Sequence, residues 1–240
     1  MAEQTLAADY EGLLRLMDGI PRGRLLDVPC GPGILARALF ARGFSEIVGI
    51  DVLPVAAFDG PPGCRYLRHD IDTPFPFSDG EFGVVVSREG VEHLTAPYAF
   101  LGEACRVLAP GGLLFVTTPN IMSVDGRVKY LLTGYFPKFR DMVNDREALR
   151  QQAYQGHVSP IYFWQLVTFL ERYGLRVEQA ATDTTTGERR LYKRLLHRIL
   201  AVLIRQASRH RGFDGLGVVS DSLLFGDSLI IRARKDGRSS

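Results

Sequence analysis

The chain has 240 residues, of which 46% are hydrophobic and 23% charged, and its formal net charge is +2. These values are typical of a soluble globular protein of one domain. Three scattered cysteines (Cys30, Cys64 and Cys105) exclude a disulfide framework and a CxxC metal site, which favours a reducing, cytoplasmic compartment. The first residues lack a signal-peptide pattern, and no apolar run could span a bilayer.

Strands and helices alternate along most of the chain, which predicts a single α/β domain over residues 1–240. The predicted elements are a lead helix 4–19, strand 24–28, helix 33–43, strands 46–50, 64–69 and 82–87, helix 97–108, strand 112–118, helix 160–173 and strand 175–182. Continuous apolar runs such as residues 84–86 are typical of parallel strands buried on both faces. The pattern therefore predicts a Rossmann-like, doubly wound, mostly parallel sheet.

A glycine-rich turn follows the first predicted strand. Gly31 and Gly33 stand in this turn, and Asp51 ends the next apolar run, 20 residues after Gly31. Glycine lets backbone N–H groups approach a ligand closely, and a carboxylate at that distance along the chain suits a ribose diol. The pattern predicts a nucleoside-containing cofactor. Because Gly31-x-Gly33-x-x-Ala36 also fits the dinucleotide fingerprint, a nicotinamide dehydrogenase is an alternative at this point.

Two segments interrupt the alternation. Residues 120–157 form a long insert rich in aromatic and basic residues, which predicts a lid or substrate-binding element. Residues 186–212 are predicted to form a basic amphipathic helical insert, since residues 189–211 contain no acid. The apolar residues Leu191, Leu195, Ile199, Val202 and Leu203 share one side of that helix, opposite Arg190, Arg194, Arg198 and Arg205. The helix either contacts anionic lipid or packs its apolar side on the domain or on a partner subunit. The sequence contains no recognised nucleic-acid-binding module, so no nucleic-acid partner is expected.

Further motifs complete a family pattern: Asp70-Ile71, the run 74–77, Glu92-His93 and the run 106–112 with its Pro110-Gly111-Gly112 turn. Together with the glycine-rich turn, they resemble the class I S-adenosylmethionine-dependent methyltransferases of type 11/23. The chain looks closest to the group that contains quinone-biosynthesis O-methyltransferases. The resemblance covers residues 22–182, and 222–235 more loosely, and implies a seven-stranded sheet whose last strand, 222–234, is antiparallel. A dehydrogenase would not need these additional motifs.

The resemblance implies S-adenosyl-L-methionine as the cofactor and assigns residues to it. The cofactor loop of the family is matched by Asp27, Gly31 and Gly33, and the carboxylate that holds both ribose hydroxyls is matched by Asp51. The adenine contact is matched by Asp70 together with the Ile71 backbone, and Ser87 faces the methionine end of the cofactor. The sequence departs from the family at Pro29, where glycine is usual, and at Gly83, where aspartate is common.

Two histidines are the candidate catalytic residues, because a hydroxyl acceptor benefits from a base that removes its proton. His157 lies at the exit of the insert, and His93 follows the fourth strand. No resident metal is expected. The alternative is a divalent ion at Glu89, Glu92 and His93, whose spacing resembles a metal site in quinone O-methyltransferases.

The function expected from these features is S-adenosylmethionine-dependent O-methylation of a small-molecule, lipid- or sugar-linked acceptor, with a possible peripheral contact between the protein and anionic membrane. The alternative is a catalytically silent protein that binds S-adenosylmethionine or serves as a scaffold.

Overall fold

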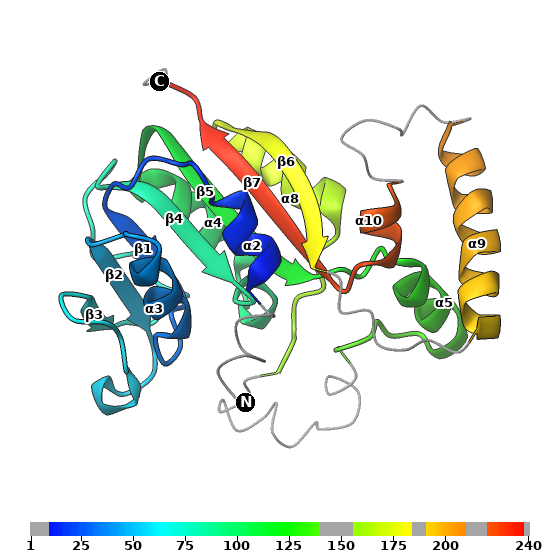
Figure 1. The fold of residues 1–240 in the computed structure, drawn as a ribbon, viewed down its shortest axis with the longest axis horizontal. Coiled ribbons are helices and arrows are strands. Elements are labelled where there is room, and N and C mark those ends of the chain that lie inside the picture. Colours follow the sequence, from blue (N-terminus) through cyan, green and yellow to red (C-terminus); the bar gives the residue numbers. More distant parts are fainter. Residues whose placement is uncertain (1–9, 140–155, 184–190, 210–219, 238–240) are drawn as a thin grey trace.

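The computed structural model describes residues 10–139, 156–183, 191–209 and 220–237. Its elements in chain order are α2 (Glu11–Leu16), β1 (Leu25–Asp27), α3 (Ile34–Ala41), β2 (Ile47–Asp51), η1 (Val55–Ala57), β3 (Arg65–Arg68), β4 (Phe82–Arg88), η2 (Val91–His93), α4 (Pro97–Val107), β5 (Leu108–Pro119), α5 (Val124–Thr133), α8 (Phe163–Arg172), β6 (Leu175–Asp183), α9 (Leu191–Arg209), α10 (Asp221–Phe225) and β7 (Ser228–Lys235). Figure 1 shows them along one twisted sheet.

The sheet has seven strands in the order β3-β2-β1-β4-β5-β7-β6. Strands β1 to β5 pair in parallel, and β7 runs antiparallel between β5 and β6. This confirms the predicted Rossmann-like sheet with an antiparallel last strand. The final strand is shorter than predicted, because the first residues of the 222–234 segment belong to the short helix α10.

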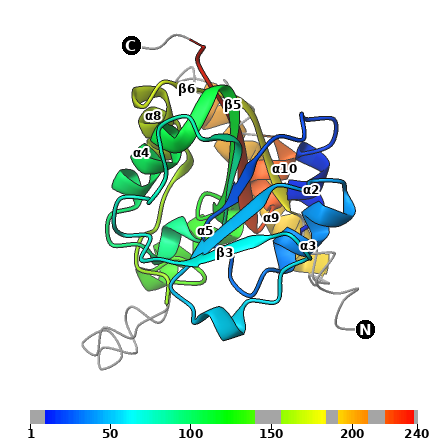
Figure 2. The ribbon, with the colours of Figure 1, turned by 90° about the vertical axis from the view of Figure 1, so that its left-hand side faces the viewer.

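Helices cover both faces of the sheet, as Figure 2 shows from the side. On one face, Leu26 and Val85 pack with residues of α4 and α8, whereas on the other face Leu25 and Val84 pack with residues of α2 and α3. Successive strand residues point to opposite faces, so a continuous apolar strand supplies both cores at once. That is why the central strands carry runs of valine, leucine and isoleucine without alternation.

A third, smaller cluster joins the two interrupting segments beyond the end of the sheet. Val124 of α5, Ala201 of α9 and Leu224 of α10 are buried together. Figure 1 shows α10 between the sheet and α9. The predicted helical insert 186–212 is therefore a helix over Leu191–Arg209, and its remaining ends lie outside the described residues. Of the predicted lid 120–157, the first part contains α5, whereas residues 140–155 lie outside the described residues, so the lid remains a prediction.

Within the described part of the chain, every helix is too short or too polar to cross a bilayer.

Candidate functional site

The carboxyl ends of β1, β2 and β4 meet at one edge of the sheet and position charged side chains there. Asp27 ends β1, Asp51 ends β2 and Arg88 ends β4. Parallel strands place their carboxyl ends together, where ligands bind in open α/β sheets. A cavity of about 270 Å³ opens at this edge, and its lining residues are Tyr10, Asp27, Pro29, Cys30, Gly31, Pro32, Ile34, Leu35, Asp51, Arg88 and Glu89.

The turn after β1 is built from glycines in the left-handed region. Gly31 has φ +52° and Gly33, the N-cap of α3, has φ +89°. A Cβ atom on Gly33 would lie only 3.0 Å from the backbone nitrogen of Gly60, so glycine is required there both for φ and for space. The N–H of Gly31 donates to the Oδ2 of Asp51 across 2.8 Å, and the N–H of Leu53 donates to its Oδ1 across 3.1 Å. The turn therefore holds the Asp51 carboxylate in a fixed orientation.

Asp27 is a buried carboxyl group whose two oxygens have no hydrogen-bond partner within the described residues. Burial, followed by the nearby Asp51 carboxylate, raises the pKa of Asp27 to about 8, and Arg88 lowers it in part. Buried carboxylates without partners are costly in a folded protein. Since Asp27 lines the cavity, a cationic ligand group placed there would satisfy it.

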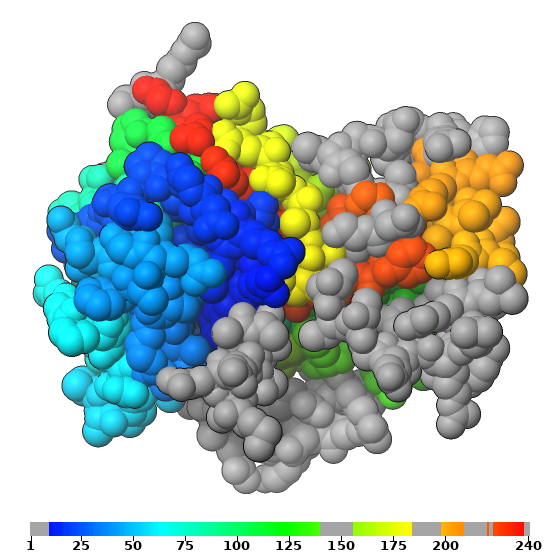
Figure 3. Space-filling view, viewed as in Figure 1, coloured from blue at the N-terminus to red at the C-terminus, as the bar shows by residue number. Residues whose placement is uncertain are grey.

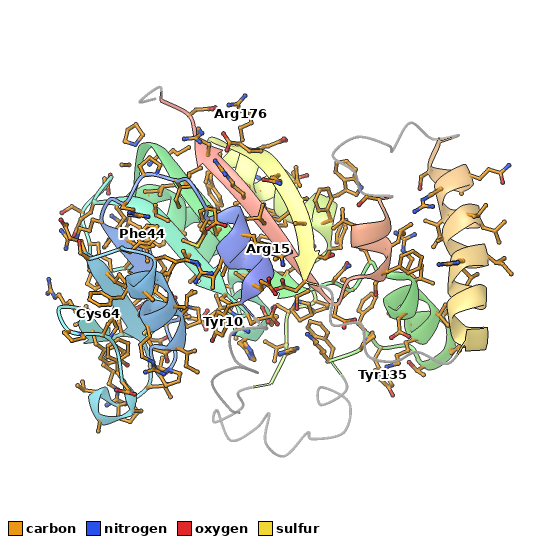
Figure 4. The ribbon with its side chains drawn as sticks, in the orientation of Figure 1. Tyr10, Arg15, Phe44, Cys64, Tyr135 and Arg176 are labelled. Atoms are coloured by element: carbon orange, nitrogen blue, oxygen red, sulfur yellow. The ribbon has the colours of Figure 1, made fainter. Side chains whose placement is uncertain are left out.

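Tyr10 and Arg88 complete the cavity wall. The guanidinium carbon of Arg88 lies 3.9 Å from the centre of the Tyr10 ring, in a cation–π arrangement. Tyr10 is labelled in Figure 4, at the start of α2. The sequence motifs did not point to Tyr10, because no spacing rule connects a residue before the lead helix with the tip of the fourth strand.

The remaining predicted cofactor residues lie outside this cavity wall. Ser87 is fully buried in β4, Ile71 belongs to the core beside α4, and Gly33 begins α3. Asp70 is exposed just after β3, in whose register with β2 Arg68 lies opposite Asp51. The Oδ1 of Asp70 accepts a hydrogen bond from the N–H of Asp72. The structure thus brings Asp27, Gly31 and Asp51 together, and the cofactor roles assigned to these residues and to the others stay predictions.

A second polar cluster joins the predicted catalytic histidines. The rings of His93 and His157 are 4.6 Å apart between centroids, edge to face. The Nε2 of His157 lies 4.0 Å from the Oε1 of Glu92, and the Phe139 ring packs 5.2 Å from the His157 ring. The sequence places the two histidines 64 positions apart, so their contact comes from the fold alone.

Backbone hydrogen bonds clamp the segment that carries His157 onto η2. The N–H groups of Val158 and Ser159 both donate to the carbonyl of Glu92, across 2.8 and 2.9 Å. The hydroxyl of Ser159 donates to the carbonyl of Leu94 across 2.6 Å. A ring nitrogen of His93, Nδ1, lies 3.1 Å from the carbonyl oxygen of Gly156. The two bonds to the Glu92 carbonyl join backbone to backbone, so they hold the His157 segment beside Glu92 independently of the side chains of the cluster.

Glu92 is a fully buried carboxyl group at the centre of this cluster. Its Oε2 accepts from the Thr118 hydroxyl across 3.2 Å, whereas its Oε1 has no hydrogen-bond partner among the residues described. Burial and then the neighbouring Glu89 raise the pKa of Glu92 to about 8.

Glu89 connects this cluster to the cavity, since it lines the cavity and acts electrostatically on Glu92. It has φ +44°, a conformation that non-glycine residues rarely adopt and that is common at functional sites.

The groups that could hold a metal differ from the predicted set. Glu92, His93 and His157 each offer one ligand atom, and these atoms lie within 4.8 Å of one another. The predicted set contained Glu89 in place of His157. Two imidazoles and one carboxylate suit a transition metal such as zinc better than magnesium.

The profile of a methyltransferase domain family matches residues 3–180, about three quarters of the chain. The chain belongs to the class I S-adenosylmethionine-dependent methyltransferases. S-adenosylmethionine is accordingly the cofactor of its family, and the dehydrogenase alternative is excluded.

Curated relatives are similar over part of the chain. An uncharacterized methyltransferase from Mycobacterium sp. (strain JLS) is 42% identical over 117 residues, which make up 47% of this chain and 46% of that protein. A ubiquinone biosynthesis O-methyltransferase from Bradyrhizobium sp. (strain ORS 278) is 35% identical over 102 residues, 40% of each chain. The chain spans about half the length, or less, of these relatives.

Solved structures share the fold at low sequence identity. An S-adenosylmethionine-dependent methyltransferase from Mesorhizobium loti superposes with a TM-score of 0.58 at 16% identity and covers 95% of this chain and 98% of its own. One from Archaeoglobus fulgidus gives a TM-score of 0.56 at 16% identity, with coverages of 97% and 94%. The arrangement of the sheet is thus that of known methyltransferases.

The residues at the sheet edge fit S-adenosylmethionine. This molecule carries an ammonium and a sulfonium group, and the unpartnered Asp27 carboxyl in the cavity offers a buried counter-charge for such a cation. The fixed carboxylate of Asp51 faces the same cavity and can accept hydroxyl hydrogen bonds. The methyltransferase fold and the chemistry of the cavity therefore agree.

Proposed function

We propose that this protein transfers the methyl group of S-adenosylmethionine to a hydroxyl oxygen of a small-molecule, lipid- or sugar-linked acceptor. The observation that carries the proposal is the position of Glu89, which lines the cofactor cavity and also adjoins the Glu92–His93–His157 cluster. A methyl donor in the cavity would thereby lie next to groups that accept a proton. Relatives named as ubiquinone biosynthesis O-methyltransferases support transfer to oxygen.

In this proposal the sulfonium supplies an already activated leaving group, so the protein chiefly positions the reactants and removes the acceptor proton. His157 is the base, because the clamp on η2 holds it and Glu92 lies 4.0 Å from its Nε2. When Glu92 is ionised, its carboxylate favours the protonated imidazole that forms as His157 accepts a proton. His93 packs edge to face against His157 and orients its ring.

Replacing His157 by glutamine is expected to lower kcat by roughly a hundredfold, at the lower end of the range for general bases, because the leaving group is already activated. The measurement is release of S-adenosylhomocysteine with a panel of phenols, catechols, sugars and lipid-linked alcohols. Affinity for S-adenosylmethionine, determined by calorimetric titration, should change less than about twofold, since His157 lies outside the cavity wall.

Three other results would redirect the proposal. Unchanged turnover in the variant would remove His157 from the chemistry. Turnover lost with a chelator and restored by zinc would reassign Glu92, His93 and His157 to a metal site. Cofactor binding without turnover on any acceptor would support the silent binding or scaffold alternative.

We also propose a reducing, cytoplasmic location, which the cysteines support. Cys30, Cys64 and Cys105 are all free thiols, and Cys30 and Cys105 are buried.

A further inference from the structure

Helix α9 buries a different face from the one that its sequence pattern favours. The residue that packs against α5 and α10 is Ala201, with Leu200 and Ile204 partly buried beside it. A small residue lets α9 approach its neighbours closely, so the contact centres on Ala201, with Leu200 and Ile204 packed beside it. The face on the other side of the helix is left for other contacts.

That remaining face is apolar and open to solvent. Ile199, Val202 and Leu203 are 52%, 58% and 56% exposed. They follow the i, i+3, i+4 spacing of one helical face, and among the described residues this face is not part of a buried core cluster. The neighbouring helix α5 adds Leu131 and Leu132, which are even more exposed.

The same helix is strongly basic. Residues 189–211 contain eight lysines and arginines and no acid. Arg198 is exposed next to Ile199, and Arg205 lies two positions beyond Leu203. Figure 3 shows α9 forming the outer surface at one end of the molecule, and Figure 4 shows side chains projecting from its outer side, away from α10. An exposed apolar face bordered by cations on a helix is the pattern of a helix that lies in a membrane interface.

We propose that the exposed face of α9 docks on an anionic phospholipid bilayer, with the apolar side chains entering the headgroup boundary and Arg198 at the border of the face contacting lipid phosphates. Residues 189–211 carry eight positive charges and no acid in the sequence, and this favours a bilayer over a second copy of the chain, because an identical helix facing α9 would carry the same charge. Docking places the protein where lipid-linked acceptors reside, but it requires no assumption about methyl transfer.

The apolar part of the proposal is tested by flotation of the full chain with vesicles of phosphatidylcholine and phosphatidylglycerol. Ile199→Gln combined with Leu203→Gln should lower the partition coefficient at least about tenfold, since both side chains would leave the bilayer. The matched control is Phe40→Gln combined with Val55→Gln, which also replaces exposed apolar side chains but on other elements, and it should bind like the parent.

The electrostatic part is tested by charge removal and by salt. Replacing Arg198, the exposed arginine at the border of this face, by glutamate removes one positive charge and adds a negative one, and should lower binding to the anionic vesicles roughly thirtyfold. Salt at about 1 M, where the Debye length is about 3 Å, should release the parent protein. The matched control is Arg42→Glu, the same change on an exposed arginine elsewhere in the molecule, and it should retain binding.

Several outcomes would overturn docking: a parent protein that never floats with anionic vesicles, an apolar double variant that binds as tightly as its control, or a dimer in sedimentation that the Ile199 and Leu203 substitutions dissociate. Methyl transfer enters none of these readouts, so failure of this inference leaves the proposed function untouched.

Discussion

Replacing Asp51 by asparagine is expected to weaken S-adenosylmethionine binding by about a hundredfold. The carboxylate is held by the N–H groups of Gly31 and Leu53 and faces the cavity, where it can accept bonds from two ribose hydroxyls. Charge-assisted hydrogen bonds contribute about 1.5–3 kcal/mol each. Because every 1.4 kcal/mol is tenfold in Kd, a loss of about 1.4 kcal/mol in each of the two bonds raises Kd about a hundredfold. Calorimetric titration measures it directly.

The control for this substitution is Asp59→Asn. It makes the same change in net charge on a side chain that is 89% exposed and paired with Arg37 at the surface. Its Kd should equal that of the parent. An unchanged Kd in the Asp51 variant, or an equal loss in the Asp59 variant, would show that Asp51 makes no specific contact with the cofactor.

Replacing Asp27 by asparagine is expected to stabilise the cofactor-free protein at pH 8 while weakening cofactor binding. Burial first, then Asp51, raises the pKa of Asp27 from 3.8 to about 8. Between those two values the folded state retains a proton that the unfolded state has lost, so the folding stability falls as the pH rises. A pKa shift of this size corresponds to several kcal/mol of folding free energy. A neutral, isosteric asparagine removes this cost.

Denaturant unfolding at several pH values checks this result. The free energy of unfolding of the parent should fall between about pH 4 and pH 8, and that of the variant should fall less. Part of the pH dependence should remain in the variant, because the raised pKa of Glu92 acts in the same direction. Asp18→Asn, at an exposed position, is the control and should keep the parental slope. Equal slopes in the parent and the Asp27 variant would show that Asp27 is already ionised and paired in the folded protein.

The sheet and the cofactor turn could be predicted because their signals are local. The apolar run before Gly31 and the carboxylate Asp51 lie within about 30 residues of sequence, and each follows from strand periodicity and turn chemistry. The parallel pairing of β1 and β2 then brings the two together. No long-range information was needed for this half of the site.

The other half of the site depends on contacts between distant segments. His93 and His157 meet because backbone bonds join η2 to residues 158 and 159, and Tyr10 meets Arg88 because α2 packs across the sheet. The pattern of α9 identified its apolar side but not the side that packs, which Ala201 decides by its small size. Side-chain periodicity does not encode such choices.

The measurement that tests the central claim most directly is calorimetric titration of the full chain with S-adenosylhomocysteine and, separately, with NAD. Both ligands contain an adenosine ribose. Only S-adenosylhomocysteine has an amino-acid end whose ammonium group Asp27 can pair with. The cavity at Asp27, Gly31 and Asp51 predicts saturable binding of S-adenosylhomocysteine at one site and no saturable binding of NAD. Absence of S-adenosylhomocysteine binding, or NAD binding of equal affinity, would contradict the assignment of this cavity to the methyl donor.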